Sequence, residues 1–332
     1  MKLLVTGGAG FIGTNFVLRW SRLHPEDELV VLDKLTYAGN RDNLAAVAEA
    51  VEFVEGDICD PATVRAAIQG CSHVVHFAAE SHVDRSLYGG EEFLRTGVFG
   101  TYHLLEAARE AELERFVMIS TDEVYGPVME GHSRESDELR PSSPYAASKV
   151  AADRLAHSYF VTHRVPVVIT RSSNNYGPYQ HPEKQLPFFT TQALQDQPIT
   201  VYGDGRATRD WLHVEDNCAG IEQVLRRGEL GQVYNIGAGD ERSILDNARL
   251  VLEELGKSDE LLRFVDSQQI RPGHDLRYGV DSSRLRGLGW EPRIPVESGL
   301  RATIRWYAEH EDWWRAMKER SRSFFEQHYG KR

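Results

Sequence analysis

Near the amino terminus, the sequence Lys2-Leu3-Leu4-Val5-Thr6-Gly7-Gly8-Ala9-Gly10-Phe11-Ile12-Gly13 places a short apolar run directly before a glycine-rich loop. We predict a buried strand over residues 2–6, then a turn, then a helix whose apolar residues recur from Phe11 to Trp20. The glycines can be read as Gly-x-Gly-x-x-Gly (8, 10, 13) or as Gly-x-x-Gly-x-x-Gly (7, 10, 13). Either spacing lets a ligand approach the backbone closely, so that a pyrophosphate can sit at the helix N-terminus.

A second apolar run, residues 29–32, ends in Asp33, twenty residues after Gly13. A carboxylate there can bind the adenosine ribose 2′-hydroxyl and repel a 2′-phosphate, which favours NAD over NADP. Lys34 beside it leaves some room for NADP. The glycines alone would fit a plain strand-to-helix turn, but the strand, glycines, helix and acid together predict an NAD site.

Strand-like and helix-like patterns alternate through the first half of the chain. We predict strands over residues 51–54, 74–77, 116–119 and 165–170, and helices over residues 91–111 and 145–163. The buried side of the first helix should carry Phe93, Leu94, Val98, Leu104, Leu105 and Ala108. This order predicts an α/β fold with a doubly wound parallel sheet. Prolines then break up the chain, so we expect a Rossmann domain over residues 1–173 and mainly a substrate-binding lobe over 174–332, with segments near 210–237 returning to the first domain.

Chemically active residues follow the strand predicted over 116–119. Thr121, Asp122 and Glu123 come at its carboxyl end, where open α/β sheets bind their ligands. Tyr145 and Lys149 are four residues apart on a predicted helix and share one face. Because a neighbouring cation favours a phenolate, we expect a lowered Tyr145 pKa. The alternative for the acidic pair is a solvated cap that follows Thr121 as N-cap.

Composition limits the classes of function. A formal net charge of −12 over 332 residues argues against nucleic acid as a partner. No apolar run approaches the roughly 20 residues that span a membrane, and we see no signal peptide. Three cysteines, an odd number outside any Cys-x-x-Cys pattern, indicate a cytoplasmic protein. No ligand spacing predicts a metal, and we interpret His73 and His76 as structural.

Taken together, these motifs resemble those of the extended short-chain dehydrogenases/reductases, and within them the NAD-dependent nucleotide-sugar 4,6-dehydratases. The Tyr145-x-x-x-Lys149 pair marks only the superfamily. The Asp122-Glu123 pair is the specific sign, because related epimerases and decarboxylases lack that combination. The resemblance covers nearly the full length and includes residues 32–40, 78–86, 120–126, 173–178, 182–184, 209–216, 234–237 and 271–275.

The resemblance implies a mechanism that uses one cofactor twice. Tyr145 would take the proton of the sugar 4-hydroxyl while hydride leaves C4 for NAD, with Lys149 and Thr121 supporting the phenolate and the new carbonyl. Glu123 would remove the C5 proton, and a protonated Asp122 would donate to the departing 6-hydroxyl. The hydride would then return to C6. The implied substrate is a nucleotide-diphospho-hexose, dTDP-glucose first and UDP-glucose second.

The resemblance also implies the contacts of both ligands. Asp57 is among the cofactor contacts, although a turn or helix-cap acid before Pro61 is an alternative for it. A homodimer, packed as a four-helix bundle through helices near 91–111 and 145–163, is implied as well. The expected cofactor contacts are Gly7, Gly10, Phe11, Ile12, Gly13, Asp33, Lys34, Leu35, Thr36, Asp57, Ile58, Ala78, Ala79, Ser81, Thr96, Tyr145, Lys149 and Asn175. The expected substrate contacts are Ser81, Thr121, Asn174, Lys184, Arg209, Arg271 and His274.

Three positions depart from the family pattern. Ile244 stands where an asparagine near the nucleotide is usual, Ile270 where an aspartate is usual, and Gly97 where an asparagine is expected. The first two leave the base and hexose preference open. Two rival interpretations remain: an epimerase or decarboxylase of the same fold, which needs no carboxylate pair, and a non-catalytic NAD-sensing regulatory protein, which needs no intact Tyr145-Lys149 pair.

Overall fold

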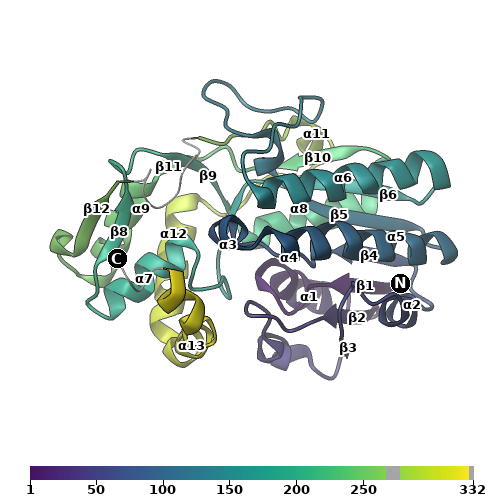
Figure 1. Cartoon of the computed structure of the whole chain (residues 1–332), viewed down its shortest axis with the longest axis horizontal. Coiled ribbons are helices and arrows are strands. Elements are labelled where there is room, and N and C mark those ends of the chain that lie inside the picture. Colours follow the sequence, from purple (N-terminus) through teal and green to yellow (C-terminus); the bar gives the residue numbers. More distant parts are fainter. Residues whose placement is uncertain (267–276, 329–332) are drawn as a thin grey trace.

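The structure is a computed structural model that describes residues 1–266 and 277–328, with side chains up to residue 322. A parallel sheet of seven strands forms the larger part of the molecule, in the order β10-β6-β5-β4-β1-β2-β3 (Figure 1). This confirms the predicted doubly wound parallel sheet. The strands are β1 (Lys2–Thr6), β2 (Glu28–Asp33), β3 (Val51–Glu55), β4 (His73–His76), β5 (Arg115–Thr121), β6 (Val167–Ser172) and β10 (Val233–Ile236).

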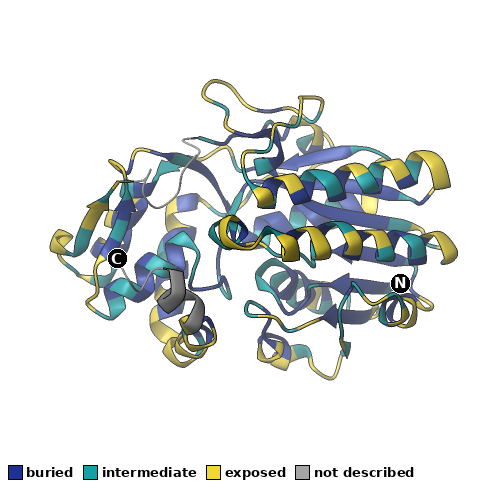
Figure 2. Cartoon of the chain, in the orientation of Figure 1, coloured by how far each residue is buried: buried dark blue, intermediate teal, exposed yellow. Residues whose placement is uncertain are grey.

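Helices cover both faces of this sheet, which is why its strands are apolar throughout. Successive strand residues point to opposite faces: Leu3 and Val5 pack on one side and Leu4 on the other. Figure 2 shows the sheet buried while the outer sides of the helices α5 and α6 are exposed. One face packs against α1 (Phe11–Leu23), α8 (Val214–Arg227) and α11 (Ser283–Arg286), and the other against α2 (Pro61–Ile68), α5 (Thr101–Glu110) and α6 (Pro144–His163).

The helix predicted over residues 91–111 is built from three pieces: α4 (Gly90–Leu94), the π-helical segment η2 (Arg95–Gly100), and α5. Phe93, Leu104, Leu105 and Ala108 are buried as predicted, and Val98 is half-buried. The prediction for Leu94 is wrong, since this residue is 50% exposed. The buried stripe runs from Phe93 through Gly97, Gly100 and Thr101 to Leu104 at helical spacing, and Leu94, one residue after Phe93, falls on the outer side of it.

A smaller lobe with its own core follows β6. Proline spacing gave no sign of its short strands, which form two small sheets, β11-β9-β7 and β12-β8. Their side chains pack with three helices around Phe189, Trp211 and Leu300. The elements of this lobe are β7 (Asn174–Tyr176), α7 (Gln185–Leu194), β8 (Ile199–Tyr202), β9 (Thr208–His213), β11 (Glu241–Ser243), α9 (Ile244–Leu255), η4 (Asp259–Leu261), β12 (Leu262–Val265), α12 (Val296–Glu309) and α13 (Glu311–His328).

Two segments after β6 return to the large sheet. β10 pairs with β6, and α8 packs on the face that also carries α1. The preceding strand β9 does not join them, because it pairs with β7 and β11 in the smaller lobe. The remaining short elements are α3 (Val83–Tyr88), η1 (Arg41–Val47) and η3 (Asp122–Tyr125).

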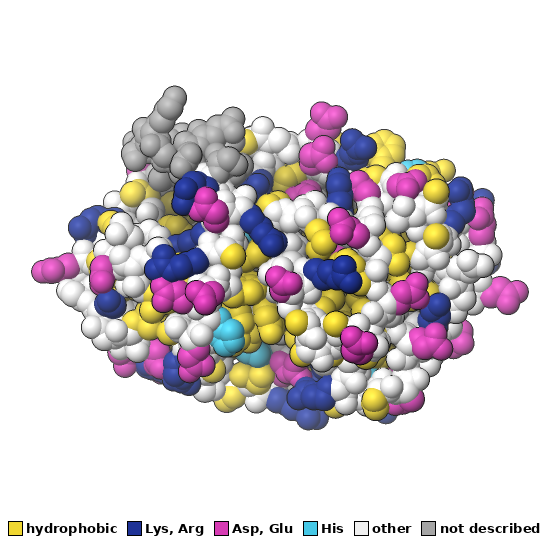
Figure 3. Space-filling view, turned by 90° about the horizontal axis from the view of Figure 1, so that it is seen from below, with side chains coloured by type: hydrophobic (Ala, Val, Ile, Leu, Met, Phe, Trp, Pro, Cys, Tyr) yellow, Lys and Arg dark blue, Asp and Glu magenta, His cyan; other side chains and the backbone are white. Residues whose placement is uncertain are grey.

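The surface view in Figure 3 shows basic and acidic side chains interspersed over one face of the molecule. Within the described residues, no helix combines the length and the apolar character needed to cross a membrane. The three cysteines are free.

Candidate active site

One cavity collects most of the predicted site residues at the carboxyl edge of the large sheet. It lies where the chain turns from β1 toward β2 on one side and from β4 toward β5 on the other, the place at which such sheets bind ligands. Loops from the smaller lobe close its other side. Its lining includes Gly7, Gly10, Phe11, Ile12, Gly13, Asp33, Lys34, Thr36, Asp57, Ile58, Ala78, Ala79, Ser81, Thr96, Thr121, Asp122, Glu123, Tyr145, Lys149, Asn174, Asn175 and Lys184.

The glycine loop fits the spacing 7, 10 and 13. Gly7 has φ +72°, and a Cβ at this position would lie 2.6 Å from the Ala78 nitrogen. A Cβ at Gly13 would collide with the Gly7 carbonyl oxygen. Gly8 instead faces Val31 in the core, 2.7 Å from where its Cβ would be. The loop therefore brings bare backbone and the N-terminus of α1 to the cavity wall, as a pyrophosphate site requires.

Asp33 ends β2 with its carboxylate fixed by the backbone. Its Oδ1 accepts from the Leu35 N–H at 2.8 Å and its Oδ2 from the Ala9 N–H at 2.9 Å. Burial raises the pKa of Asp33, against these two hydrogen bonds. Lys34 is paired with Asp57, at 2.8 Å between Nζ and Oδ2. The loop, the α1 N-terminus and Asp33 together fit the adenosine diphosphate half of NAD.

Asp57 is not the cap of α2, because that cap is Asp60, which accepts from Ala62 and Thr63. The Asp57 carboxylate binds Lys34 and also accepts from the Cys59 N–H at 2.8 Å. It lies in the cavity wall together with Ile58. Asp57 therefore does stabilise a turn, through its bond with the Cys59 N–H. Its place in the cavity wall also lets a cofactor reach it.

Thr121, Asp122 and Glu123 stand where β5 passes into η3. The Thr121 hydroxyl caps η3, accepting from the Glu123 N–H at 3.3 Å, and donates to Asp122 Oδ1 at 3.1 Å. The predicted cap is therefore present, but the carboxyl groups are not solvated. Asp122 is 3% exposed, Glu123 is half-buried, and both line the cavity.

Asp122 is in an environment that favours its protonated form. Burial, followed by the neighbouring Glu123, raises the pKa of Asp122 to about 8. Its Oδ2 is buried and makes no hydrogen bond with the described residues. A carboxylic acid in this position can donate a proton near neutral pH.

The raised Asp122 pKa predicts that the difference in stability between wild type and Asp122→Asn depends on pH. The folded carboxyl keeps its proton up to about pH 8, while the unfolded one loses it near pH 4. Asp122 therefore stabilises the fold most below about pH 4, and that contribution is lost as the pH rises to about 8. Denaturant unfolding should show the free energy of unfolding of wild type falling relative to Asp122→Asn across this window.

Asp60→Asn is the matched control for this experiment. Hydrogen bonds from Thr63 and Ala62 lower the pKa of Asp60, so its effect is confined to lower pH. The difference between wild type and Asp60→Asn should stay flat above about pH 4. An equally flat profile for Asp122→Asn would contradict the raised Asp122 pKa.

The expectation of a lowered Tyr145 pKa is wrong. Burial, then the charge of Glu123, raises the pKa of Tyr145, against a hydrogen bond with Thr121. Lys149 does line the cavity, but its Nζ donates to the Ile119 carbonyl oxygen at 2.6 Å. Burial lowers the Lys149 pKa to about 8. Sharing a helix face thus brings the pair into one cavity without making Tyr145 acidic.

Several predicted contacts lie elsewhere. Leu35 does not line the cavity. Its backbone has a positive φ of 54°, and its N–H donates to the Asp33 carboxylate. Arg209 does not line the cavity. Its guanidinium lies 4.9 Å from the centre of the Tyr278 ring. Its charge nevertheless lowers the Asp122 pKa, against burial and Glu123. Arg271, His274 and Ile270 fall outside the described residues.

Two of the departures from the family pattern are described. Ile244 is 7% exposed and packs in the core of the smaller lobe, away from the cavity wall. Gly97 faces α6, and a Cβ there would meet the Ser148 hydroxyl at 3.4 Å, an ordinary contact, so the packing of η2 on α6 does not require glycine. Neither residue contacts the acidic pair.

Some cavity residues were missed in the sequence. Glu80 follows Ala78 and Ala79 in the same loop, and burial raises its pKa. Its place after β4 could have identified it. The ends of β5 and β6 could likewise have identified Ser120, Ser172 and Ser173, whereas Gln180 and His181 depend on the approach of a distant segment, which no local pattern shows. The missed polar residues are Glu80, Ser120, Ser172, Ser173, Gln180 and His181.

A buried contact, which we call the lobe bridge, joins the two sides of the cavity. Arg85 of α3 donates through Nε to Glu183 Oε2 at 3.0 Å, and the Glu183 side chain is 1% exposed. The Arg85 guanidinium also lies 3.7 Å from the centre of the Tyr37 ring. Beside it, Lys184 Nζ donates to the Ser81 carbonyl oxygen at 2.6 Å. The loops after β2 and β4 are thereby tied to the loop before α7.

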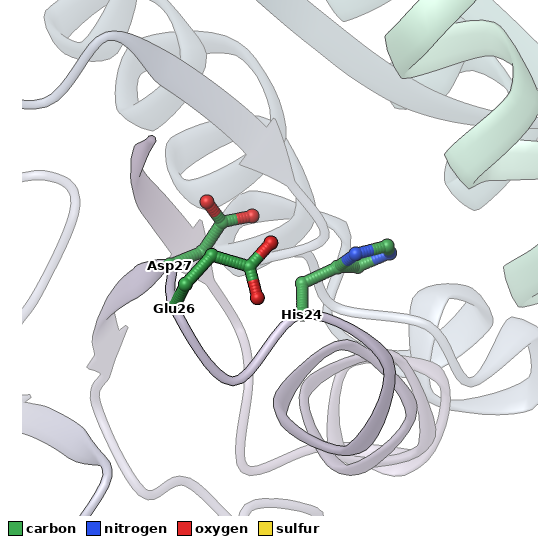
Figure 4. A group of neighbouring side chains, drawn as sticks. All are labelled: His24, Glu26 and Asp27. Atoms are coloured by element: carbon green, nitrogen blue, oxygen red, sulfur yellow. The ribbon is translucent and has the colours of Figure 1, made fainter.

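One group of described side chains has the composition of a metal site, but lies at the opposite edge of the sheet. His24, Glu26 and Asp27 form the turn before β2 (Figure 4). His24 is already bound by Glu222 at 2.7 Å, and the Arg226 guanidinium lies 3.0 Å from its Nε2. Asp27 accepts from the amino terminus and from Trp20. A neighbouring guanidinium and existing partners disfavour a cation, so we assign no metal here.

The fold and the cavity define an extended short-chain dehydrogenase/reductase with a dinucleotide site. Comparison with known proteins is consistent with this class. The family model described as GDP-mannose 4,6 dehydratase matches residues 4–303. The chain belongs to this family.

Individual relatives cover almost the whole chain. The Low-salt glycan biosynthesis protein Agl12 of Haloferax volcanii is 49% identical over 309 residues, 92% of this chain and 98% of the relative. A dTDP-glucose 4,6-dehydratase of Streptomyces niveus is 47% identical over 325 residues, 96% of each chain. The crystal structure of DesIV, a dTDP-glucose 4,6-dehydratase from Streptomyces venezuelae with NAD and TYD bound, is 46% identical and superimposes with a TM-score of 0.93, covering 96% of this chain and 100% of the other.

Proposed function

We propose that this protein is an NAD-dependent nucleotide-sugar 4,6-dehydratase that removes water from dTDP-glucose, or from UDP-glucose, to give the 4-keto-6-deoxy sugar. The observation that carries the proposal is the meeting of two kinds of group in one cavity. A dinucleotide site and the pair Tyr145 and Lys149 serve oxidation, while Asp122 and Glu123 add an acid and a base. The relatives described above support the same activity.

The oxidation half of the reaction is assigned to Tyr145, Lys149 and Thr121. When bound, NAD would supply a carrier that accepts hydride from C4 of the sugar and returns it to C6. Tyr145, whose ring packs edge-on against Phe93 at 6.3 Å, takes the 4-hydroxyl proton. Because burial and the charge of Glu123 raise the Tyr145 pKa, the Lys149 cation must offset the negative charge that develops on the phenol.

The elimination half is assigned to the adjacent carboxyl groups. Once C4 is a ketone, the C5 hydrogen is acidic, and Glu123 removes it. Asp122, kept protonated by burial and by Glu123, gives its proton to the departing 6-hydroxyl. Two neighbouring acids with different environments can thus hold opposite protonation states.

The wider arrangement belongs to the same proposal. Residues 1–173 would bind the cofactor and residues 174–332 mainly the substrate, with Asn174 and Lys184 in the cavity wall. We also propose a cytoplasmic homodimer through the helices near 91–111 and 145–163. Exposed apolar side chains on these helices support the dimer: Leu94 is 50% exposed, Phe99 60%, Tyr102 40% and Val161 53%. The free cysteines fit a cytoplasmic location.

A direct assay tests the activity. Purified protein is incubated with dTDP-glucose and, separately, with UDP-glucose, and the product is analysed by mass spectrometry. We expect a product lighter by one water, with dTDP-glucose turned over faster. A product of unchanged mass with an inverted C4 would indicate an epimerase. A third incubation with UDP-glucuronic acid would reveal a decarboxylase by loss of carbon dioxide, and NAD binding without turnover of any of the three sugars would indicate a regulatory protein.

A further inference from the structure

A buried network that the mechanism above does not use lies behind the cavity. Arg171 of β6 donates to Asp153 of α6 through Nε at 2.9 Å and through Nη2 at 3.2 Å. Its Nη1 donates to the Tyr125 hydroxyl at 2.7 Å, and Tyr125 in turn donates to Asn235 Oδ1 of β10 at 2.8 Å. Tyr125 is 4% exposed, Arg171 is 1% exposed, and Asp153 and Asn235 are fully buried.

This network connects the two elements that carry the reacting groups. Tyr125 is the last residue of η3, which begins with Asp122. Asp153 lies one turn after Lys149 on α6, the helix that also carries Tyr145. None of the four network residues lines the cavity. Their contacts therefore act on the reaction from outside the cavity, through the position of η3 relative to α6 and, for Asp153, through its charge near Lys149.

The network keeps its charges because they are paired. The Arg171 guanidinium holds the pKa of Asp153 below its usual range despite burial. Asp153 in turn opposes the lowering of the Lys149 pKa by burial. On the other side of Tyr125, Asn235 is fixed by donating to the Ser133 carbonyl oxygen at 3.0 Å. The Tyr125 hydroxyl thus links η3 to both the ion pair and β10.

We propose that Tyr125 is a positioning residue for elimination. Its hydroxyl, held between Arg171 and Asn235, fixes η3 and so sets Asp122 and Glu123 at the right place relative to Tyr145. This inference rests on the proposed dehydratase activity. The acid and the base act on C5 and C6, next to the carbon served by Tyr145, so a shift of η3 misplaces them while oxidation continues.

The variant Tyr125→Phe removes only this hydroxyl. The ring and its contact with the Arg171 guanidinium, 4.9 Å from the ring centre, are retained. We expect kcat for dTDP-glucose to fall about 10- to 100-fold, because a displacement of about 1 Å can cost that much, while KM stays within about 2-fold. In a single turnover, more of the enzyme should be found with NADH, since elimination then lags behind oxidation.

Tyr159→Phe is the matched control. Tyr159 is likewise a buried tyrosine, but it lies on α6, and its hydroxyl donates to Glu106 of α5 at 2.5 Å, away from the cavity. This variant should keep the kcat and the NADH fraction of wild type. Thermal unfolding of both variants shows whether either has simply lost its fold.

Amide hydrogen exchange tests the position of η3 independently of activity. A peptide spanning residues 119–126 should exchange faster in Tyr125→Phe than in wild type or Tyr159→Phe. Unchanged exchange overturns the proposal, even if wild type proves inactive toward both sugar nucleotides. It is equally overturned if Tyr125→Phe lowers the melting temperature but leaves kcat and the NADH fraction at wild-type values, or raises KM alone.

Discussion

Tyr145→Phe is expected to lower turnover of dTDP-glucose by roughly 10²- to 10⁴-fold, the range that a positioned acid or base contributes. The phenol is the group in the cavity placed to take the 4-hydroxyl proton, and its loss blocks the first step of the reaction. No NADH should therefore appear during a single turnover. The measurement is the steady-state rate together with NADH absorbance after mixing enzyme and substrate.

The interpretation of Tyr145→Phe depends on the packing of the ring being kept. Phenylalanine preserves the edge contact with Phe93, so NAD affinity and melting temperature should remain close to wild type. Tyr159→Phe, which changes the same chemistry elsewhere on α6, should be fully active. Turnover of Tyr145→Phe at the wild-type rate would remove this tyrosine from the mechanism.

Glu123→Gln is expected to give the opposite signature. Dehydration should fall by roughly 10²- to 10⁴-fold because the base for the C5 proton is gone. Oxidation at C4 should continue, since Tyr145, Lys149 and Thr121 are unchanged, and the enzyme should accumulate bound NADH. Rapid mixing that follows NADH absorbance and the mass of the product together measures both halves.

A neutral amide at position 123 also changes the pKa of the neighbouring groups Asp122 and Tyr145. The Glu123 charge contributes to the raised pKa of both Asp122 and Tyr145, so those pKa values should fall in the variant. Glu222→Gln is the control, a half-buried glutamate bound by Arg19 and His24 on the far side of the sheet. Normal dehydration by Glu123→Gln would show that another group is the base.

The large sheet could be predicted because its strands are buried on both faces. Continuous apolar runs such as Phe116 to Ile119 therefore mark them, and the predicted strands agree with the structure within two residues at each end. The short strands β8, β11 and β12 were not predictable in the same way. Each has four residues or fewer, and their partners lie far away in the chain.

The candidate site likewise contains residues that a local sequence pattern predicts and residues that only tertiary packing brings there. The glycine loop, Asp33 and the Thr121-Asp122-Glu123 triplet are local patterns, and each lies in the cavity wall. The pKa of Tyr145 was mispredicted because helical spacing fixes a direction, while depth of burial and the acceptor chosen by Lys149 depend on tertiary packing. Gln180 and His181 reach the cavity only because the smaller lobe folds back on the large sheet.

The lobe bridge between Arg85 and Glu183 bears on how the cofactor is held. Removing one partner of such a buried ion pair costs roughly 3–5 kcal/mol, and the bridge lies where the loops around the dinucleotide site meet. We expect NAD to leave only when this bridge opens, so the nucleotide should stay bound through many turnovers, which repeated turnover after removal of free NAD would measure. An enzyme built in this way would make its deoxysugar at the same pace whatever the balance of oxidised and reduced NAD in the surrounding cell.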